Sequence, residues 1–355
     1  MSVRDFRERI SIKDVARAAG TSITTVSRSL NNHPDVSEET RDRILAIAQA
    51  QGYQRNVLAH SLISGRSGLI SVIIPDIKYD YELLFLRGMT HAARRLDQEL
   101  LLTVRDSTAG IVEACRSMYQ RGLTDGAVVY QPPVEGEADF LELQKAGFPL
   151  VGFQPPFPIR GLTSVEPMDY EGGLLAVQHL LSLGHQRIAI IVEDTQRTAG
   201  HERLRGYQDA LQHAGIFIDP QLLKVVPINQ PQRSGRAAIR QWIESGIDFT
   251  AVFCFNDLVA YGAIEEAAMH GRQVPQDISI VGFDDISASP RFGWRGLTTV
   301  KQPITRIGEL ALETLLQLCN GEAVPGQRIR VPVELVVRGT TAKLARAAEP
   351  ITSHG

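Results

Sequence analysis

From Gly68 onward, short apolar runs alternate with amphipathic stretches of helical period. The runs are rich in β-branched residues and read LISVIIPD, ELLLTVRD, DGAVVYQ, FPLVGFQ, RIAIIVED, LLKVVPI, TAVFCFND and DISIVGFDD. Helical patterns lie between and after them, for example at 82–97, 111–121, 170–183, 201–214, 232–245, 257–270 and 304–319. Continuous apolar strands that alternate with helices are typical of parallel sheets covered on both faces. The sequence therefore predicts an α/β body.

The predicted strands are too many for one comfortable sheet, and their order predicts two similar halves. We expect the first half at about 69–183 plus 302–330 and the second at about 184–301 plus 331–341. The segments LTTVKQP and IRVPVELVVR are expected to cross between the halves. Many runs end in Asp, Asn or Gln, at the carboxyl ends where open α/β sheets bind ligands. The body, 68–341, is therefore predicted to bind a small molecule.

Composition places the chain among ordinary globular proteins, with 355 residues, 43% of them hydrophobic and 22% charged. The first ten residues alternate charges, and no segment has the roughly 18 apolar residues of a membrane span. We therefore expect a cytoplasmic protein with no membrane partner. The three cysteines, Cys115, Cys254 and Cys319, do not have the spacing of metal ligands. We therefore expect them to be reduced residues that pack in the core, and we expect neither a metal nor a cofactor.

The charge is unevenly distributed along the chain. Residues 1–66 hold ten Arg or Lys and seven Asp or Glu, a net charge of +3. The whole chain carries −3, so the remainder carries −6. A basic segment joined to an acidic body is typical of a DNA-binding headpiece attached to another domain.

Two short helices are predicted close together within the first thirty residues. Ser11 is the expected N-cap of the first, with Asp14 as the acid of a capping box, and Gly20 ends the helix. One face is apolar and carries Ile12, Val15, Ala16 and Ala19. Ser22 is the expected N-cap of the second helix, SITTVSRSL. A tight turn with Gly between two short helices is the helix-turn-helix arrangement, in which the second helix enters the major groove of DNA.

The outward face of the second helix suits base recognition. Val26 and Leu30 point inward at i, i+4, which leaves short hydroxyl side chains, Ile23 and Arg28 outside. Small side chains permit close approach to DNA, and Arg can form two bonds with a guanine edge. A solvated helix face would explain the same pattern.

A third short helix follows the first two. Ser37 caps it, Ile44, Ile47 and Ala48 point inward, and Gly52 stops it. Three short helices with a small shared core predict a self-contained headpiece at 1–54.

The run IKDVARAAGTSITTVSRSLNNHPDVSEETRDRILAIAQAQGYQRN resembles the headpiece of the lac repressor/galactose repressor family. It matches that family's pattern of D-V-A, A-G-x-S, T-V-S-R, N, V-S, T-R and G-Y at unbroken spacing. The resemblance implies a sequence-specific transcriptional regulator whose base-reading residues are Ile23, Thr24 and Arg28. It also implies residues that hold phosphates or set the docking angle: Thr21, Ser22, Thr25, Ser27 and Asn31.

Residues 55–67 form the predicted link between headpiece and body. Asn56 can cap a short helix with Leu58 and Leu62 at i, i+4, too short to be stable alone. The resemblance implies a hinge helix that folds on DNA, pairs with its dimer mate and inserts Leu62 into the minor groove as an apolar wedge. The alternative is a linker whose leucines pack on the body. The family commonly has Pro before this Asn, whereas this chain has Arg55.

The body resembles the type I periplasmic-sugar-binding-protein fold that serves as the effector domain of the same family. The matching segments are HLLSLGHQRIAII, R-x-x-G-Y from Arg203 to Tyr207, CFNDLVAYGA, DISIVGFDD and LTTVKQP. With the headpiece, the resemblance covers about residues 10 to 341. The remainder, 342–355, is expected to be a flexible tail, and because it lacks leucine heptads we predict a homodimer without a coiled-coil tetramer.

The resemblance also implies a set of effector-binding residues. Acidic, amide and guanidinium groups can bond vicinal hydroxyls, while a ring packs on the apolar face of a sugar. Arg203 would serve a nucleobase or an anionic ligand equally well. Alternatively, Asp169 and Asp284 are loop caps and Arg203 forms an ion pair between domains. The implied set is Tyr79, Tyr81, Tyr130 or Gln131, Asp169, Arg203, Asn256, Asp284 and Gln302.

One position departs from the pattern of the effector site. Gln230 stands where some family members stack an aromatic side chain on the ligand. The stacking partner is then either absent or replaced by Tyr79, Tyr81 or Phe253.

Together these features predict a repressor that binds a pseudo-palindromic operator as a dimer under allosteric control by a small molecule. A sugar or sugar derivative is the expected effector, and a purine or nucleoside is the alternative. An enzyme is a weaker reading, because His179, His185 and His201 show no nucleophile–base spacing, phosphate loop or metal motif. The headpiece and the lack of a signal segment count against a transport-associated solute-binding protein.

Overall fold

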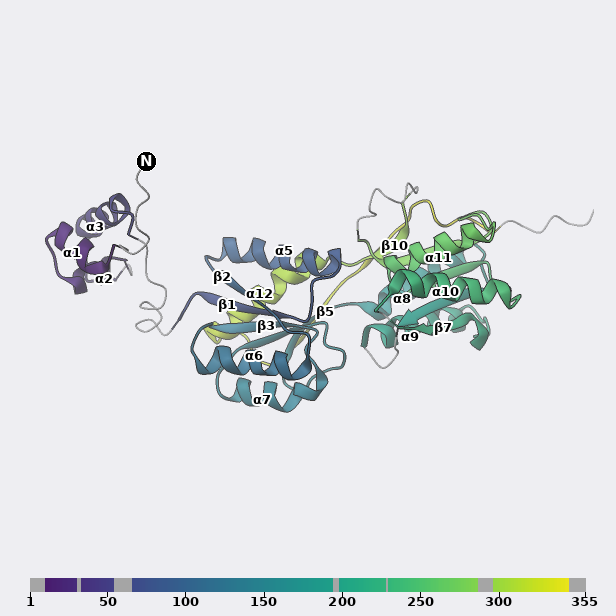
Figure 1. Cartoon of the computed structure of the whole chain (residues 1–355), viewed down its shortest axis with the longest axis horizontal. Coiled ribbons are helices and arrows are strands. Elements are labelled where there is room, and N and C mark those ends of the chain that lie inside the picture. Colours follow the sequence, from purple (N-terminus) through teal and green to yellow (C-terminus); the bar gives the residue numbers. More distant parts are fainter. Residues whose placement is uncertain are drawn as a thin grey trace, which may run out of the picture. The chain divides into compact units, whose positions relative to one another are not determined.

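The computed structural model describes residues 10–30, 33–53, 66–193, 198–227, 229–286 and 296–344. The chain divides into two compact units, with the boundary in the sequence between Ser67 and Gly68 (Figure 1). No helix among the described residues is long and apolar enough to cross a membrane.

The first unit contains helices α1 (Ile12–Ala19), α2 (Ile23–Leu30) and α3 (Glu38–Ala50). The predicted end signals are present: the Asp14 carboxylate accepts the Ser11 N–H at 3.0 Å, and Gly20 adopts a left-handed φ of 61°. Ser22 Oγ accepts the Thr25 N–H at 3.1 Å, which satisfies one of the free donors at the start of α2. Local hydrogen bonds therefore define where these helices begin and end.

A small apolar core holds the three helices together, as the sequence predicts. Its buried members are Val15, Ala16, Ala19, Val26, Ile44 and Ala48, with Ile12, Leu30, Ile47 and Tyr53 partly buried against them. Each helix contributes to this core, so the three helices form one unit.

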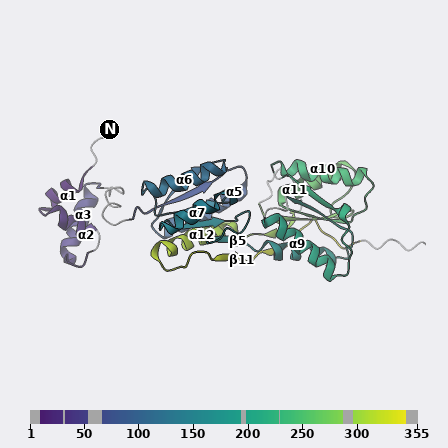
Figure 2. The same cartoon turned by 90° about the horizontal axis from the view of Figure 1, so that it is seen from below.

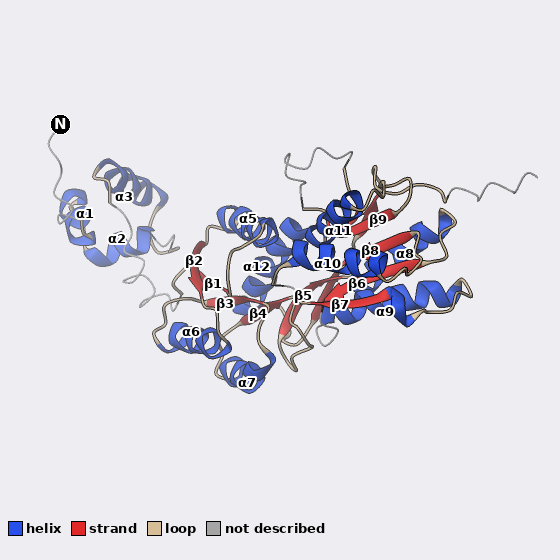
Figure 3. Ribbon diagram, turned by 45° about the vertical axis from the view of Figure 1, so that its right-hand side comes forward, coloured by secondary structure: helices blue, strands red, loops and turns tan. Residues whose placement is uncertain are grey.

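The first half of the body is a six-stranded parallel sheet. Helices cover both faces: α5 (Asp80–Arg95) and α12 (Ile304–Asn320) lie on one, and α6 (Thr108–Gln120) and α7 (Glu137–Lys145) on the other (Figure 3). A short 3₁₀ turn, η1 (Val134–Gly136), precedes α7. In spatial order the strands are β11 (Arg328–Val331), β5 (Thr163–Pro167), β4 (Leu150–Phe153), β3 (Gly126–Tyr130), β1 (Leu69–Ile74) and β2 (Glu99–Val104).

The second half repeats this plan, except that its edge strand β12 runs antiparallel to β10. Helices α8 (Asp169–Ser182) and α9 (Thr198–His213) cover one face, and α10 (Pro231–Glu244) and α11 (Asp257–Met269) cover the other. Figure 2 shows α9 on the opposite side of the sheet from α10 and α11. The turn η2 (Pro220–Leu222) precedes β7. In spatial order the strands are β12 (Glu334–Val336), β10 (Thr298–Lys301), β9 (Ser279–Asp284), β8 (Ala251–Cys254), β6 (Ile188–Glu193) and β7 (Leu223–Val226).

The boundary between the halves differs from the predicted one at residue 183. Helix α8 buries Ala176, Val177 and Leu180 in the core of the second sheet, together with Ile188 and Ile190. The crossing therefore lies between β5 and α8, and residues 169–183 belong to the second half. Chain order placed this helix after a strand of the first sheet, but its apolar face packs elsewhere.

The predicted tail also begins later than residue 342. The carbonyl oxygen of Ala342 lies 3.0 Å from His185 Nε2, and the Leu344 N–H donates to the Leu183 carbonyl at 2.9 Å. Residues 342–344 are therefore part of the body, and residues 345–355 lie outside the described residues.

Strand β5 was not among the runs singled out in the sequence because it contains polar residues. Its Glu166 is 5% exposed and is held by Arg328 of the neighbouring strand β11, whose Nη2 lies 2.6 Å from Glu166 Oε2. This paired charge lets a carboxylate lie inside the sheet.

Paired glycines bring α5 and α12 into close contact. A Cβ atom on Gly88 would overlap the carbonyl oxygen of Thr305, and one on Gly308 would overlap that of Phe85. We expect Gly88→Ala to lower the free energy of unfolding by about 1–3 kcal/mol, because the helices would have to separate. Urea denaturation checks this, with Arg87→Ala on the exposed side of α5 as control. Equal losses of unfolding free energy in Gly88→Ala and Arg87→Ala would contradict the expected overlap between a Cβ atom at residue 88 and α12.

Candidate functional site

Helix α2 presents the predicted base-reading residues to solvent. Ile23 is 45% exposed, Thr24 is exposed, and the Arg28 side chain is 51% exposed. Among the described residues, the Arg28 side chain forms a long ion pair of 3.7 Å with Asp35. The opposite side of the helix is closed by Val26 and by Ser29, whose hydroxyl donates to the Thr25 carbonyl at 2.8 Å. An exposed apolar side chain beside a hydroxyl and a guanidinium group suits a groove-reading face.

The other predicted DNA contacts fall into two groups. Ser22 and Thr25 serve the helix start itself, because the Ser22 hydroxyl lies 2.8 Å from Thr25 Oγ1 and also accepts a backbone N–H. Thr21 and Ser27 are half-buried. Four residues of interest lie outside the described residues: Asn31, Arg55, Asn56 and Leu62. Their predicted roles in the headpiece and hinge therefore remain predictions.

In the body, five of the predicted effector residues come together. Each lies at or just beyond the carboxyl end of a strand or on a helix that follows one, as expected for a ligand site in parallel sheets. Hydrogen bonds and ion pairs connect them in one chain. We call this set the polar cluster: Tyr81, Asp169, Arg203, Asp284 and Gln302.

Arg203 of α9 is the buried cation of the polar cluster and is only 2% exposed. Its Nε and Nη2 each lie 2.8 Å from Asp169 Oδ1, and its Nη1 donates to the Phe255 carbonyl at 2.5 Å. Nη2 lies 3.9 Å from Asp284 Oδ1. The guanidinium carbon also lies 3.6 Å from the centre of the Phe283 ring. The charge of Arg203 is therefore already satisfied by carboxylates, a carbonyl and an aromatic face.

Gln302 connects the two halves of the body within the polar cluster. Its Nε2 donates to Asp284 Oδ1 at 2.6 Å, and its Oε1 accepts from the Tyr81 hydroxyl at 3.0 Å. Tyr81 belongs to α5 of the first half, whereas Asp284 ends β9 of the second. Gln154, which ends the run FPLVGFQ, also lies 3.2 Å from the Tyr81 hydroxyl and was not among the predicted residues.

Burial shifts the ionisation of the carboxyl groups in and beside the polar cluster. It raises the pKa of Asp284 to about 7, although Arg203 and Gln302 favour the charged form. Burial likewise raises the pKa of Asp169 and, more strongly, of Asp257, which is also raised by the charge of Asp284. The cluster therefore carries less negative charge at neutral pH than its carboxyl count implies.

The raised pKa of Asp284 makes stability depend on pH. A carboxyl group whose pKa is higher in the folded chain than in the unfolded chain stabilises the fold at low pH. That stabilisation is lost as the pH rises from 3.8, the unfolded pKa, to about 7, the folded pKa. We expect Asp284→Asn to gain thermal stability relative to the unaltered protein between about pH 5 and about pH 8. Thermal unfolding at both pH values checks this, with Asp139→Asn in α7 as control. A stability difference between Asp284→Asn and the unaltered protein that is the same at both pH values would contradict the raised pKa of Asp284.

The remaining predicted effector residues make local contacts in the structure. The Tyr79 N–H donates to Glu82 at 2.8 Å at the start of α5. Tyr130 is 2% exposed and packs in the first core, with its ring 5.5 Å from that of Phe85. Gln131 follows β3 with a φ of 47°, and the side chain of Asn256 accepts the Val259 N–H at 2.8 Å as the cap of α11.

Sequence reasoning missed several residues around Arg203. Phe253, offered as a stacking partner for a ligand, is instead fully buried in the hydrophobic core of the second half. Phe255 and Phe283 are the rings that contact Arg203. Asp257 was also missed: it accepts the Thr299 hydroxyl at 2.5 Å and the Ile286 N–H at 2.9 Å. Its position beside Asn256 in the segment CFND was the available signal.

Two of the histidines weighed for an enzyme, His185 and His201, make no site with the polar cluster among the described residues. His185 is buried just before β6, with Nδ1 3.0 Å from Thr250 and Nε2 3.0 Å from Ser279. These residues lie at the amino ends of their strands, opposite the cluster. Burial lowers the pKa of His185, and His201 is exposed. Among the described residues no group of three His, Cys, Asp or Glu could hold a metal ion.

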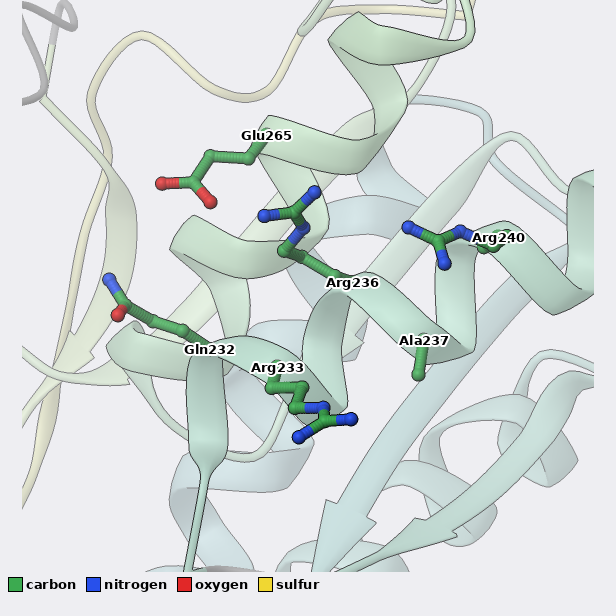
Figure 4. Close-up of a pocket in the computed structure, with 6 residues that line it drawn as sticks. All are labelled: Gln232, Arg233, Arg236, Ala237, Arg240 and Glu265. Atoms are coloured by element: carbon green, nitrogen blue, oxygen red, sulfur yellow. The ribbon is translucent and has the colours of Figure 1, made fainter.

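Two surface hollows, of about 580 and 390 Å³, flank α10 and have no lining residue in the polar cluster. Figure 4 shows Arg233, Arg236 and Arg240 projecting from α10, with Glu265 on the neighbouring helix α11. Arg236 and Arg240 both bind the buried Glu266, with Nε–carboxylate distances of 3.1 and 2.7 Å. Their charge is therefore used in joining the two helices.

Comparison with known proteins identifies the family. The family model described as bacterial regulatory proteins, lacI family, matches residues 11–56, and the periplasmic binding protein-like domain matches residues 177–341. The HTH-type transcriptional regulator DegA of Bacillus subtilis is 31% identical over 344 residues, 95% of this chain and 99% of that protein. The chain belongs to the lacI family of bacterial regulatory proteins. This confirms the predicted family and its role in transcription regulation.

Solved structures of lacI-family proteins share the fold. The lac repressor dimer bound to operator and the anti-inducer ONPF matches with a TM-score of 0.81 and 27% identity, over 94% of this chain and 100% of that one. A lacI-family regulator from Enterococcus faecium with bound ribose matches with a TM-score of 0.67 and 28% identity, over 78% and 100%. The predicted fold, a helix-turn-helix headpiece before a two-sheet α/β body, is thus confirmed.

Proposed function

We propose that this lacI-family regulator is a cytoplasmic repressor, not an enzyme, that binds a pseudo-palindromic operator as a homodimer. The observation that carries the proposal is the exposed face of α2, where Ile23, Thr24 and Arg28 stand free of the headpiece core. The similar lac repressor structure is a dimer on operator DNA. Two identical headpieces match two half-sites related by two-fold symmetry, and the bodies would join the two chains.

The effector of this regulator is proposed to be a sugar or sugar derivative bound at the polar cluster. Carboxylate, amide and phenol groups there can exchange their mutual hydrogen bonds for bonds to ligand hydroxyls. The Enterococcus faecium relative holds ribose, which supports this class. A purine or nucleoside is the second candidate, since nucleosides share the vicinal hydroxyls.

Control of DNA binding would then begin at Gln302. Its bonds to Tyr81 and Asp284 join the two halves of the body, so a ligand that replaces them changes the balance between arrangements of the halves. If that balance alters affinity for the operator, the operator must alter affinity for the ligand by the same factor.

The test of operator binding starts from a pool of random duplexes, from which the full-length protein selects its preferred sites. We expect palindromic sequences, binding that weakens as salt increases, and a dimeric mass in light scattering. Thermal-shift screening of sugars, nucleosides and purines then supplies candidate effectors for repeat measurements of operator affinity. Failure to select any palindrome at low salt would reject the repressor assignment, and a tetrameric mass would reject the dimer.

A further inference from the structure

We infer that the polar cluster accepts an uncharged polyhydroxylated effector and discriminates against its anionic analogues, with Asp284 as the residue that enforces the discrimination. This inference rests on the proposed function, because it specifies the effector of the same site. From the sequence alone, Arg203 could equally bind an anionic ligand, so this inference narrows the range of effectors.

The first argument concerns the charge available to a ligand. An anion bound in a buried site needs an uncompensated cation or several free donors. Arg203 donates to Asp169 and to the Phe255 carbonyl, lies 3.9 Å from Asp284, and has its face against Phe283. Its charge is already balanced, so a phosphate or carboxylate on the ligand would find no spare positive charge there.

The second argument concerns the carboxyl groups around the site. Asp169, Asp284 and Glu193 at the end of β6 are all less than 9% exposed, and the charges of Asp169 and Glu193 both act on Asp284. A ligand anion placed among them would be repelled through a medium of low dielectric constant. The other groups near Tyr81 are the neutral amides of Gln154 and Gln302. These groups match hydroxyl groups, which can both donate and accept.

Asp284 and Asp169 differ in their relation to Arg203. Asp169 accepts a hydrogen bond from Arg203 Nε and also lies 2.8 Å from Nη2, so its charge is needed to keep Arg203 buried. Asp284 lies farther from it and bonds instead to the neutral amide of Gln302. Removing the charge of Asp284 alone would therefore expose part of the potential of Arg203 to a ligand while leaving the closer ion pair intact.

The experiment compares matched neutral and anionic compounds on the full-length protein by titration calorimetry. The pairs are glucose with glucuronate, ribose with ribose 5-phosphate, and adenosine with its 5′-monophosphate. In the pair that binds, we expect the neutral member to bind about tenfold more tightly or better. Asp284→Asn should reduce this ratio severalfold, and Asp139→Asn, which removes a carboxylate paired with Arg116 in the first half, should leave it unchanged.

A second measurement does not depend on a variant. Lowering the pH from about 8 to about 6 protonates Asp284 while glucuronate keeps its charge, so the preference for glucose over glucuronate should diminish. The charged or titratable groups facing Asp284 come from five elements and are Tyr81, Asp169, Glu193, Arg203 and Asp257. Of these, Asp169 and Asp257 also have raised pKa values, and their protonation would act in the same direction.

The outcomes separate the inference from the proposed function. An anionic member that binds more tightly than its neutral partner, or a ratio that Asp284→Asn leaves unchanged, overturns the inference while the protein remains a ligand-controlled repressor. Absence of binding by every pair, with operator binding intact, also overturns it, because the named class has then failed. Loss of operator selection would instead remove the proposed function.

Discussion

Replacing Arg203 with methionine is expected to lower the free energy of unfolding by about 3–5 kcal/mol. The side chain is 2% exposed, and its removal leaves Asp169 and Asp284 buried without their cation. The variant must either keep an unpaired charge in the interior or protonate both carboxyl groups. Urea denaturation followed by tryptophan fluorescence measures the loss, since Trp242 is fully buried in the same half of the body.

The matched control for Arg203→Met is the double variant with Asp169→Asn, which removes the strongest partner together with the cation. We expect the double variant to recover part of the lost stability, because fewer charges are then left uncompensated. The stability losses of Arg203→Met and of Asp169→Asn could instead simply add up to the loss of the double variant. That result would show that Arg203 acts by packing on Phe283 and Phe255 and not by its charge.

Arg28→Ala is expected to weaken binding to the selected operator by about 1–3 kcal/mol, the value of one base-reading Arg. Arg28 is half-exposed, and its ion pair with Asp35 is long at 3.7 Å, so the headpiece should lose no more than about 0.5 kcal/mol of stability. Fluorescence anisotropy with the operator and with an unrelated duplex measures both affinities. The loss should be confined to the operator.

The control for Arg28→Ala is Arg43→Ala, which removes an equal charge from the exposed side of α3. We expect Arg43→Ala to weaken binding to the operator and to the unrelated duplex by the same factor, because it reduces the salt-dependent attraction of the whole headpiece to DNA. Equal losses on the two duplexes for Arg28→Ala would reassign that residue from a base contact to a phosphate contact.

The headpiece could be predicted closely because its signals are local. Ser11, Asp14 and Gly20 act on backbone groups within four residues, and these contacts define the ends of α1. The strands of the body were likewise visible as apolar runs, since burial on both faces demands continuous apolar residues. The polar strand β5 escaped this pattern because its Glu166 is neutralised by Arg328, which lies 162 residues away in the chain.

The candidate site was predictable only in part. The family resemblance brought Asp284, Gln302 and Asp169 into the prediction, and the structure joins them to Arg203 and Tyr81. The same resemblance also selected Asn256, which caps a helix. Residue type and position cannot distinguish a helix cap from a site residue, because both tasks use a side-chain oxygen at the end of a strand.

The sequence by itself determined the three-helix headpiece, the alternation of strands and helices, and the family. Periodicity and capping act between residues close in the chain, and a single sequence carries that information. Only the tertiary structure decided that α8 packs in the second half, that residues 342–344 belong to the body, and that Arg203 is already neutralised. These features depend on contacts between distant segments, whose partners are chosen by packing and by the cost of burying unpaired charge.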